Sequence, residues 1–459
     1  MKLSIFQNDK NLFEAASQFF KEELQIPVNT ISEYSIAPRE ILGDSFKAHL
    51  PSHQLLKDIW LIGLVNDEAF RREKSDESMD SLKNKSDDYD GLLIVAAELF
   101  SRENGQNPTR SQLAEIVRAF NREFKTMPVT VLFRYDGQLA IANAERMKYQ
   151  QQWREGEKVG AISLLKDISI LSTHQGHKRI LNSLAVEKMR EFDPRNKVEN
   201  YKGLLKGWLA VFRTEVLNKQ FYLDYNRLSV AMIRQINPQQ IDNKLNAHQG
   251  VLNLLNRILF IYFIQKKGWL MNDPEFIWHF WLDYQSSGQK DNFHKGWLNP
   301  LFFSAFNGKA FNELHLYKIL PVKYHQAFIS FPYLNGGLFT KHDDYDSFIL
   351  EDLYFAEIFN YLQSYIFTIK EDTADDINLE INPELLGKMY EGMINATDLD
   401  DVDAENGIVY TERPEINFMT RRSFVEVLDK KLNDGKIKYS SCLLYTSPSP
   451  RDRTRSRMP

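Results

Sequence analysis

The spacing of apolar residues in the first third of the chain predicts an α/β domain. Two segments repeat apolar residues every three to four positions, as one face of a helix does, and four are compact apolar runs typical of strands. Asp136-Gly137 separates the last two runs and is a strong hairpin signal. In chain order the prediction is helix 11–24, strand 58–65, strand 91–97, helix 109–124 capped by Thr109, and strands 128–135 and 138–144. The charged stretch 71–90 has no period and is expected to be a solvated loop.

The middle of the chain has the period of helices. Residues 171–248 are expected to form a helical connector, and 250–270 to form the strongest helix of the protein, with Leu252, Leu255 and Leu259 on its apolar stripe and Gly268 at its end. Acidic residues dominate 371–405, which favours a linker and surface loop around a further helix that begins near Leu385. An extended segment, a turn at Pro414 and a new helix from about Glu415 follow.

Composition narrows the class of protein. The chain has 459 residues, 43% of them hydrophobic and 13% aromatic, which favours several packed domains over disorder. No uncharged apolar run reaches membrane-spanning length and no signal peptide is visible, so a cytoplasmic protein without a membrane partner is expected. The single cysteine, Cys442, excludes an internal disulfide framework and a multi-cysteine metal site.

The last residues, 441–459, differ from the rest. They are rich in Ser, Pro and Arg and have no apolar period, while the chain as a whole carries a net charge of −5. This stretch looks like translated cloning sequence, so we expect a non-native tail and a natural protein that continues past about Tyr439. The alternative is a genuine basic tail that binds phosphates.

Two short motifs near the C-terminal end carry a family resemblance. The first has the pattern LGxxYE within a helix, and the second has the pattern GxxYT in the extended segment. The matching residues are Leu386, Gly387, Tyr390 and Glu391, then Gly407, Tyr410 and Thr411. This layout resembles the entry into the methyltransferase domain of adenine-specific DNA methyltransferases in fused restriction–modification enzymes, the type IIG group.

The resemblance implies S-adenosylmethionine as cofactor, bound at Gly407, Tyr410 and Thr411. The family's proline after the threonine is Glu412 here, with Pro414 two positions later, so the turn is expected to be reshaped. The alternative is a surface turn between two ordinary helices, because each motif is short.

Further elements follow in family order. Segments 217–222, 255–270, 297–306 and 333–339 resemble the helical spacer of these enzymes, with the aromatic pair Phe221-Tyr222 expected in the core and Gly336-Gly337 in a tight loop. The implied fold is an α/β domain of restriction-endonuclease-like order at 1–170 and a mainly α-helical spacer at 171–375. The first helices of a Rossmann-like methyltransferase domain would occupy 376–440.

The endonuclease-like order implies a magnesium site in the first domain. The best candidates are Asp90 and Glu98, with Glu14 on the first helix, but Phe100 stands where that core has a lysine. Asp136 with Glu145 and Lys148 is a second, badly spaced option. Alternatively, Asp90 and Glu98 only flank a strand, and the domain docks DNA without cutting it.

Basic residues interleaved with Tyr135, Tyr149 and Trp153 suit a face that contacts DNA phosphates, although a merely solvated face is as well supported. The strongest candidates for DNA contact are Arg110, Arg118, Arg122 and Lys148, with Arg257 in the spacer. The same cluster also contains Arg134, Arg146, Arg154 and Lys158. In the spacer, Lys266-Lys267 follow Arg257 along the chain. His174 and His177 have the spacing of two metal ligands on a helix. Without a third ligand nearby, a satisfied surface pair is expected.

The chain lacks the motifs that perform adenine methylation in this family. Its four Asn-Pro pairs, at 107, 237, 299 and 382, never continue Pro-Tyr, and no Asp-Pro-x-x-Gly-x-Gly run occurs. We therefore expect this polypeptide alone to be inactive, as a fragment of a site-specific DNA adenine-N6 methyltransferase that acts on double-stranded DNA. Two alternatives stay open: a bifunctional enzyme with a Mg²⁺-dependent endonuclease, and a non-enzymatic helical DNA-binding scaffold.

Overall fold

The computed structural model describes residues 2–7, 10–74, 77–84, 91–101, 105–148, 157–192, 198–212, 214–236, 244–309, 313–334, 337–368, 376–378, 381 and 413–433. The chain divides into two compact units, Met1–Ile381 and Asn382–Pro459. In the described part, helices and a mixed sheet together make an α/β architecture, as the sequence predicts.

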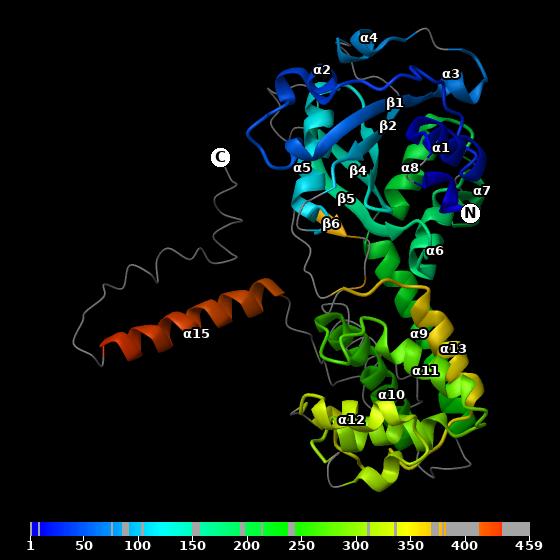
Figure 1. Ribbon diagram of the computed structural model, residues 1–459, viewed down its shortest axis with the longest axis vertical. Helices are drawn as coiled ribbons and strands as arrows, with labels where there is room; N and C mark the ends of the chain where they lie inside the picture. Colours follow the sequence, from blue (N-terminus) through cyan, green and yellow to red (C-terminus); the bar gives the residue numbers. More distant parts are fainter. Residues whose placement is uncertain are drawn as a thin grey trace. The chain divides into compact units, whose positions relative to one another are not determined.

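The first unit is built around a six-stranded sheet whose spatial order follows the sequence (Figure 1). Its strands are β1 (Leu56–Asn66), β2 (Gly91–Leu99), β3 (Val129–Tyr135), β4 (Gln138–Lys148), β5 (Glu157–Ser169) and β6 (Asp376–Asn378). Pairs β2–β3 and β5–β6 are parallel, and the other neighbours are antiparallel. The parallel β2–β3 pair needs a crossover, which α5 (Arg110–Glu123) supplies.

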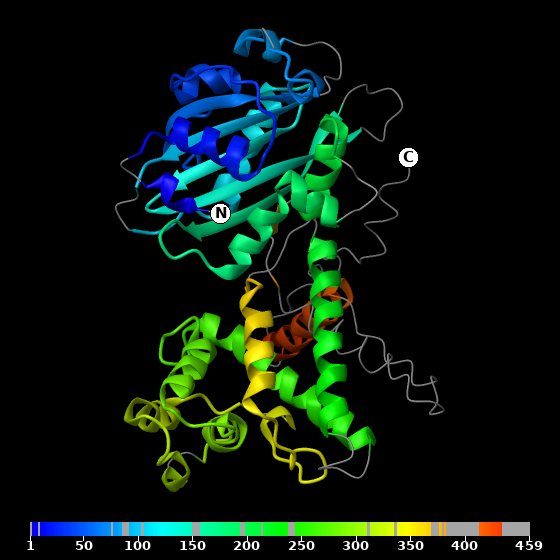
Figure 2. The same cartoon turned by 90° about the vertical axis from the view of Figure 1, so that its right-hand side faces the viewer.

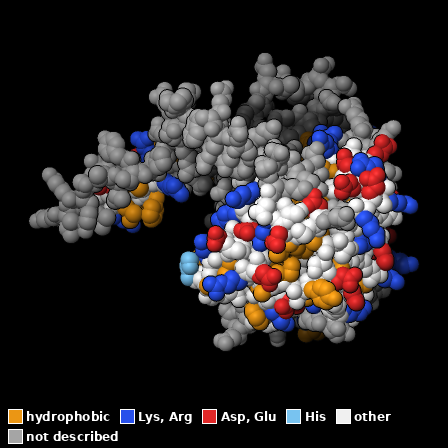
Figure 3. Space-filling view, turned by 90° about the horizontal axis from the view of Figure 1, so that it is seen from above, with side chains coloured by type: hydrophobic (Ala, Val, Ile, Leu, Met, Phe, Trp, Pro, Cys, Tyr) orange, Lys and Arg blue, Asp and Glu red, His pale blue; other side chains and the backbone are white. Residues whose placement is uncertain are grey.

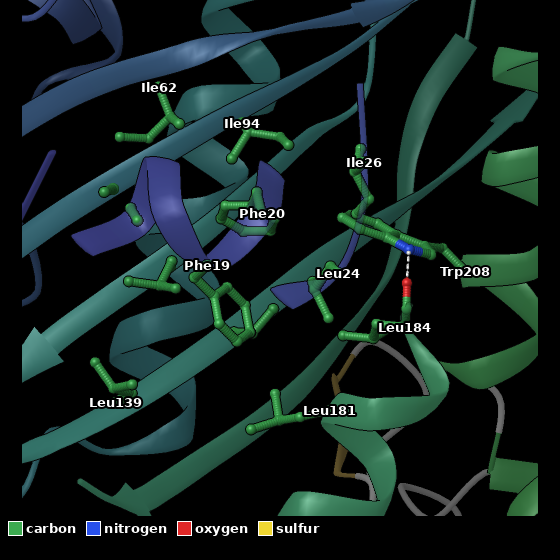
Figure 4. Close-up of a cluster of buried hydrophobic side chains, with 14 of the residues drawn as sticks. Phe19, Phe20, Leu24, Ile26, Ile62, Ile94, Leu139, Leu181, Leu184 and Trp208 are labelled. Carbon is green, nitrogen blue, oxygen red and sulfur yellow. Dashed lines mark hydrogen bonds between the residues drawn. The ribbon is translucent and has the colours of Figure 1, made fainter. Parts of the chain in front are cut away.

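Each face of the sheet is covered by helices, because strands that are apolar on both sides must be buried on both sides (Figure 2). One face packs against α1 (Leu12–Gln18), the π-helical turn η2 (Phe19–Glu23), α6 (Gln175–Ser183), α7 (Val186–Phe192) and α8 (Tyr201–Val211). Figure 4 shows this core, in which the ring of Phe20 lies 6.3 Å from that of Trp208 and Phe19 lies beside Phe20. The indole N–H of Trp208 donates to the Leu184 carbonyl at 3.1 Å. The other face packs against α2 (Pro38–Leu42) and α5.

Short helices and turns complete this part of the unit. They are η1 (Leu3–Phe6), η3 (Gly43–Ser45), η4 (His53–Leu55), α3 (Asp67–Phe70) and α4 (Met79–Lys83). Residues 79–83 fall in the segment expected to be a loop; they are helical because Ser78 caps the turn and Leu82 is fully buried.

The remainder of the first unit is helical. Its elements are α9 (Thr214–Ile236), α10 (Lys244–Ile264), η5 (Gln265–Lys267), α11 (Phe276–Ser286), η6 (Phe293–Leu298), η7 (Leu301–Ala305), η8 (Leu314–Tyr317), α12 (Val322–Ser330), η9 (Gly337–Phe339) and α13 (Asp352–Gln363). Aromatic rings dominate its core: Phe280, for example, lies 4.8 Å from Tyr324 and 5.0 Å from Trp297 between ring centroids. The Phe280–Tyr324 pair is edge-on, an arrangement that adds stability beyond buried area.

Most predicted elements are confirmed with small changes of boundary. The Thr109 cap is present as a full capping box with Gln112, and Asp136 and Gly137 form the hairpin turn with φ of 42° and 72°. The long spacer helix begins earlier than predicted, at Lys244. Its α-helical part ends at Ile264, and the 3₁₀ turn η5 that continues it ends at a left-handed Gly268. Strand β5 was not among the predicted elements, although its residues 159–165 are largely buried, because the charged stretch before it obscured the pattern.

The second unit contributes one described helix, α15 (Arg413–Asn433), which begins two residues before the predicted start. Its apolar side chains Ile416, Met419, Phe424 and Val427 are exposed. The motif-bearing segments 385–395 and 407–411 lie outside the described residues, so the predicted turn around Tyr410 stays a prediction. Among the helices that the structure describes, none is both long enough and apolar enough to cross a membrane.

Candidate functional site

Three charged side chains lie in a row across three neighbouring strands of the sheet. Asp58 at the start of β1 is in register with Glu98 at the end of β2, and Glu98 is in register with Arg134 on β3. Residues paired in this way share one face of a sheet, here the face covered by α1. Sequence reasoning missed Asp58, because its partnership with Glu98 appears only once β1 and β2 are known to be antiparallel neighbours.

Arg134 holds Glu98 in a short, nearly buried ion pair. Its Nε and Nη2 lie 2.7 Å and 2.6 Å from the same carboxylate oxygen of Glu98, and the two side chains are 6% and 16% exposed. The Nη1 of Arg134 donates to the carbonyl oxygens of Gln7 (3.2 Å) and Lys10 (2.8 Å). One guanidinium therefore connects the segment before α1 to the end of β2. Arg134 is also too buried to contact DNA phosphates, which is the role expected of the cluster of basic residues to which it belongs.

Of the predicted magnesium pair, only Glu98 is among the described residues, so the pair stays a prediction. Asp90 lies outside the described residues, but the next residue, Gly91, pairs with Asn66 at the far end of β1 from Asp58. Gly91 and Glu98 are seven residue steps apart along the strand, roughly 23 Å at the usual rise. Glu14 is exposed on α1 and Phe100 is 53% exposed.

Within the described ranges, no three or more Asp, Glu, His or Cys side chains come together in a way that could hold a metal ion. Mg²⁺ needs carboxylate oxygens at about 2.0–2.1 Å in octahedral geometry, and here a cation already binds the carboxylate of Glu98. For the second option, Asp136 lies in the hairpin turn and accepts a hydrogen bond from Ser101, whereas the side chains of Glu145 and Lys148 lie outside the described set.

The predicted basic face on α5 mixes charges of both signs. Arg110 and Arg118 are half-buried, and the exposed Arg122 lies 2.7 Å from Glu115 on the same helix. On the face viewed in Figure 3, described acidic and basic side chains are likewise interspersed. Tyr135, expected in the phosphate-contacting set, is 1% exposed and donates its hydroxyl to Asp167 at 3.2 Å. Arg110, Arg118, Arg122 and Lys148 thus stay predictions.

Arg257 of α10 lies inside the helical part rather than on its surface. It is 2% exposed and makes a bidentate ion pair with Asp346, with Nη1–Oδ1 at 2.6 Å and Nη2–Oδ2 at 3.0 Å. Its Nε also donates to the Leu338 carbonyl at 2.6 Å, and its Nη2 to the Thr340 carbonyl at 3.3 Å. This geometry argues against a DNA contact and gives Arg257 the role of fixing the loop around η9. Gly337 in that loop has no positive φ, and Gly336 lies outside the described residues.

His174 and His177 lie where α6 meets α13 in the first unit, and they are not the surface pair that the sequence predicts. The His174 Nδ1 caps α6 by accepting from the Gly176 N–H at 3.0 Å, and its Nε2 lies 3.1 Å from Gln363 of α13. Burial lowers the pKa of His174, and burial and then His174 lower the pKa of His177 to about 4. The His177 ring is therefore neutral at pH 7, and His174 joins the start of α6 to the end of α13 through Gln363.

Comparison with known proteins adds one relative. A protein of Methanocaldococcus jannaschii, provisionally named type II restriction enzyme and methyltransferase, is 31% identical over 156 residues. The match covers 33% of this chain and 12% of that protein, so the chain corresponds to a small part of the relative's length. The chain matches no protein-family profile and no solved structure.

Proposed function

We propose that this chain is part of a site-specific DNA adenine-N6 methyltransferase of a restriction–modification or phage-defence system. The observation that carries the proposal is the similarity to a protein named as both restriction enzyme and methyltransferase. The ordered motif matches from Leu217 to Thr411 agree with it. The substrate would be double-stranded DNA, and the methyl donor S-adenosylmethionine.

The cofactor would approach the segment Gly407–Thr411, ahead of helix α15. A helix N-terminus with its free backbone N–H groups favours a negatively charged group, and the carboxylate of the methionine moiety is such a group. The chain's own contribution would be to bind and orient the cofactor there. The chemistry on adenine needs groups that the motifs of this chain do not include, so methylation would belong to the longer protein.

The test is to express the complete gene and map modified bases in the host DNA by long-read sequencing. We expect N6-methyladenine at one recurrent sequence, and no methylation with the 459-residue chain alone. Tyr410→Ala and Thr411→Ala in the complete protein should weaken S-adenosylmethionine binding at least about tenfold, the effect of losing a contact of about 1.4 kcal/mol. Tyr34→Ala, at a tyrosine that is 83% exposed, is the matched control.

Three results would contradict the proposal. Methylation of cytosine alone would remove the adenine assignment. Methyl transfer by the short chain would show that its catalytic groups were overlooked. DNA binding without methylation by the complete protein, at any concentration of S-adenosylmethionine, would favour the non-enzymatic scaffold.

A further inference from the structure

The ion pair of Arg134 and Glu98 involves the residue that the sequence offers as a magnesium ligand of the first domain. Asp58 and Glu98 are side by side on antiparallel strands, and α1 covers the same face. Two neighbouring carboxylates on one face repel each other unless a cation lies between or beside them. That cation must be either a bound metal ion or a basic side chain.

In the structure the cation is the side chain of Arg134, and all three of its guanidinium nitrogens have hydrogen-bond acceptors. Arg134 directs two nitrogens to Glu98 and a third to two backbone carbonyls, so its planar fork is satisfied on both sides. It comes from the adjacent strand in register with Glu98, so the rigid sheet fixes its position. A divalent ion on the same carboxylate oxygen would have to displace a guanidinium that is 6% exposed and also holds Gln7 and Lys10.

We infer that Arg134 takes the structural place of a divalent cation in this domain. Its guanidinium neutralises Glu98 and fastens the N-terminal segment to the sheet, so the domain folds without a metal and does not hydrolyse DNA through Glu98. Phe100, in the position where the endonuclease core would have its lysine, fits the same conclusion. The inference does not depend on the methyltransferase proposal, because its measurements are metal binding and stability of the first domain.

The experiment compares thermal unfolding of the 459-residue chain in EDTA and in millimolar Mn²⁺. For the native chain we expect the same Tm in both buffers. Glu98→Gln keeps the shape but leaves Arg134 buried without its counter-charge, so its Tm should fall by at least about 5 °C in both buffers. Arg122→Met, which removes an exposed cation paired with Glu115, is the control and should shift Tm by less than about 2 °C.

Opposite results are expected if Glu98 is a metal ligand. Mn²⁺ would then raise the native Tm, Glu98→Gln would abolish that rise, and Glu98→Gln in EDTA would be as stable as the native chain. A native Tm raised by Mn²⁺, or a Glu98→Gln variant as stable as the native chain in EDTA, overturns the inference.

Two further measurements cover the case in which Glu98→Gln does not fold. Titration of the native chain with Mn²⁺, followed by electron paramagnetic resonance, should show no site filled at micromolar concentrations. Arg134→Lys keeps the charge but loses the fork, so it should lower Tm by less than Glu98→Gln does. A tight Mn²⁺ site that competes with Mg²⁺ and is lost in Asp58→Asn would refute the inference.

Cleavage by the complete protein gives an independent check. If it cuts DNA with Mg²⁺, Glu98→Gln assayed well below its Tm should cut at the native rate. A folded Glu98→Gln protein that has lost cleavage would place the reaction at Glu98 and overturn the inference.

Discussion

Replacing Arg257 tests whether this residue supports the fold or contacts DNA. Arg257→Met keeps the aliphatic stem, but it leaves Asp346 buried at 6% exposure without a counter-charge and removes the donors to the Leu338 and Thr340 carbonyls. Breaking a buried ion pair by removing one partner costs about 3–5 kcal/mol. Each lost hydrogen bond to a carbonyl adds about 1 kcal/mol.

The sum predicts that Arg257→Met lowers the free energy of unfolding by about 5–7 kcal/mol. Arg257→Lys should cost roughly half as much, because an ammonium keeps the charge but cannot bond both Asp346 oxygens and both carbonyls in one plane. Arg257→Met with Asp346→Leu should recover part of the loss, since neither charge is then left alone. The measurement is urea unfolding followed by circular dichroism and tryptophan fluorescence.

Arg71→Met is the matched control. Arg71 also pairs with an acid, Glu73, at 3.1 Å, but both side chains are more than half exposed, so we expect a change of less than about 1 kcal/mol. The reasoning is refuted if Arg257→Met unfolds at the native urea concentration. If that variant also loses tenfold or more in DNA affinity while Arg257→Lys keeps it, Arg257 contacts phosphates instead.

Three further predictions concern the first unit. Folding lowers the pKa of His177 to about 4, below the unfolded value near 6.5. The neutral ring therefore contributes its full stability above pH 6.5, and that contribution is lost as the pH falls towards 4. His177→Met should remove up to about 3 kcal/mol of this pH dependence, measured by urea titrations at pH 7 and pH 4.5. A Cβ at Gly63 would lie 2.2 Å from the Asn29 carbonyl oxygen, so Gly63→Ala should lower Tm by several degrees in a thermal scan. An unchanged Tm would show that the β-bridge between Asn29 and Leu64 can shift to make room for the methyl group. Trp208→Phe leaves the Leu184 carbonyl without its donor and should cost about 2–3 kcal/mol in urea unfolding, with no cost expected if water replaces the indole N–H.

The sequence by itself determined the elements whose signals are local. Thr109 with Gln112 marks the start of α5, Asp136-Gly137 marks the hairpin, and Gly268 marks the end of the long spacer helix. Each signal works because the hydrogen bonds involved join residues only a few positions apart, so the neighbouring sequence fixes them. The family resemblance likewise came from short motifs in a fixed order.

Only the tertiary structure decided what the charged residues do. Glu98 and Arg134 are 36 positions apart, and Arg257 and Asp346 are 89 apart. The first pair is nearly buried, the second is fully buried, and both are joined at hydrogen-bonding distance. From the sequence, Glu98 is a candidate metal ligand and the two arginines are candidate phosphate contacts. A charged side chain without a partner stays in contact with water, and it is buried only when it is paired with an opposite charge. Strand register and helix packing bring that partner near, and the local sequence does not.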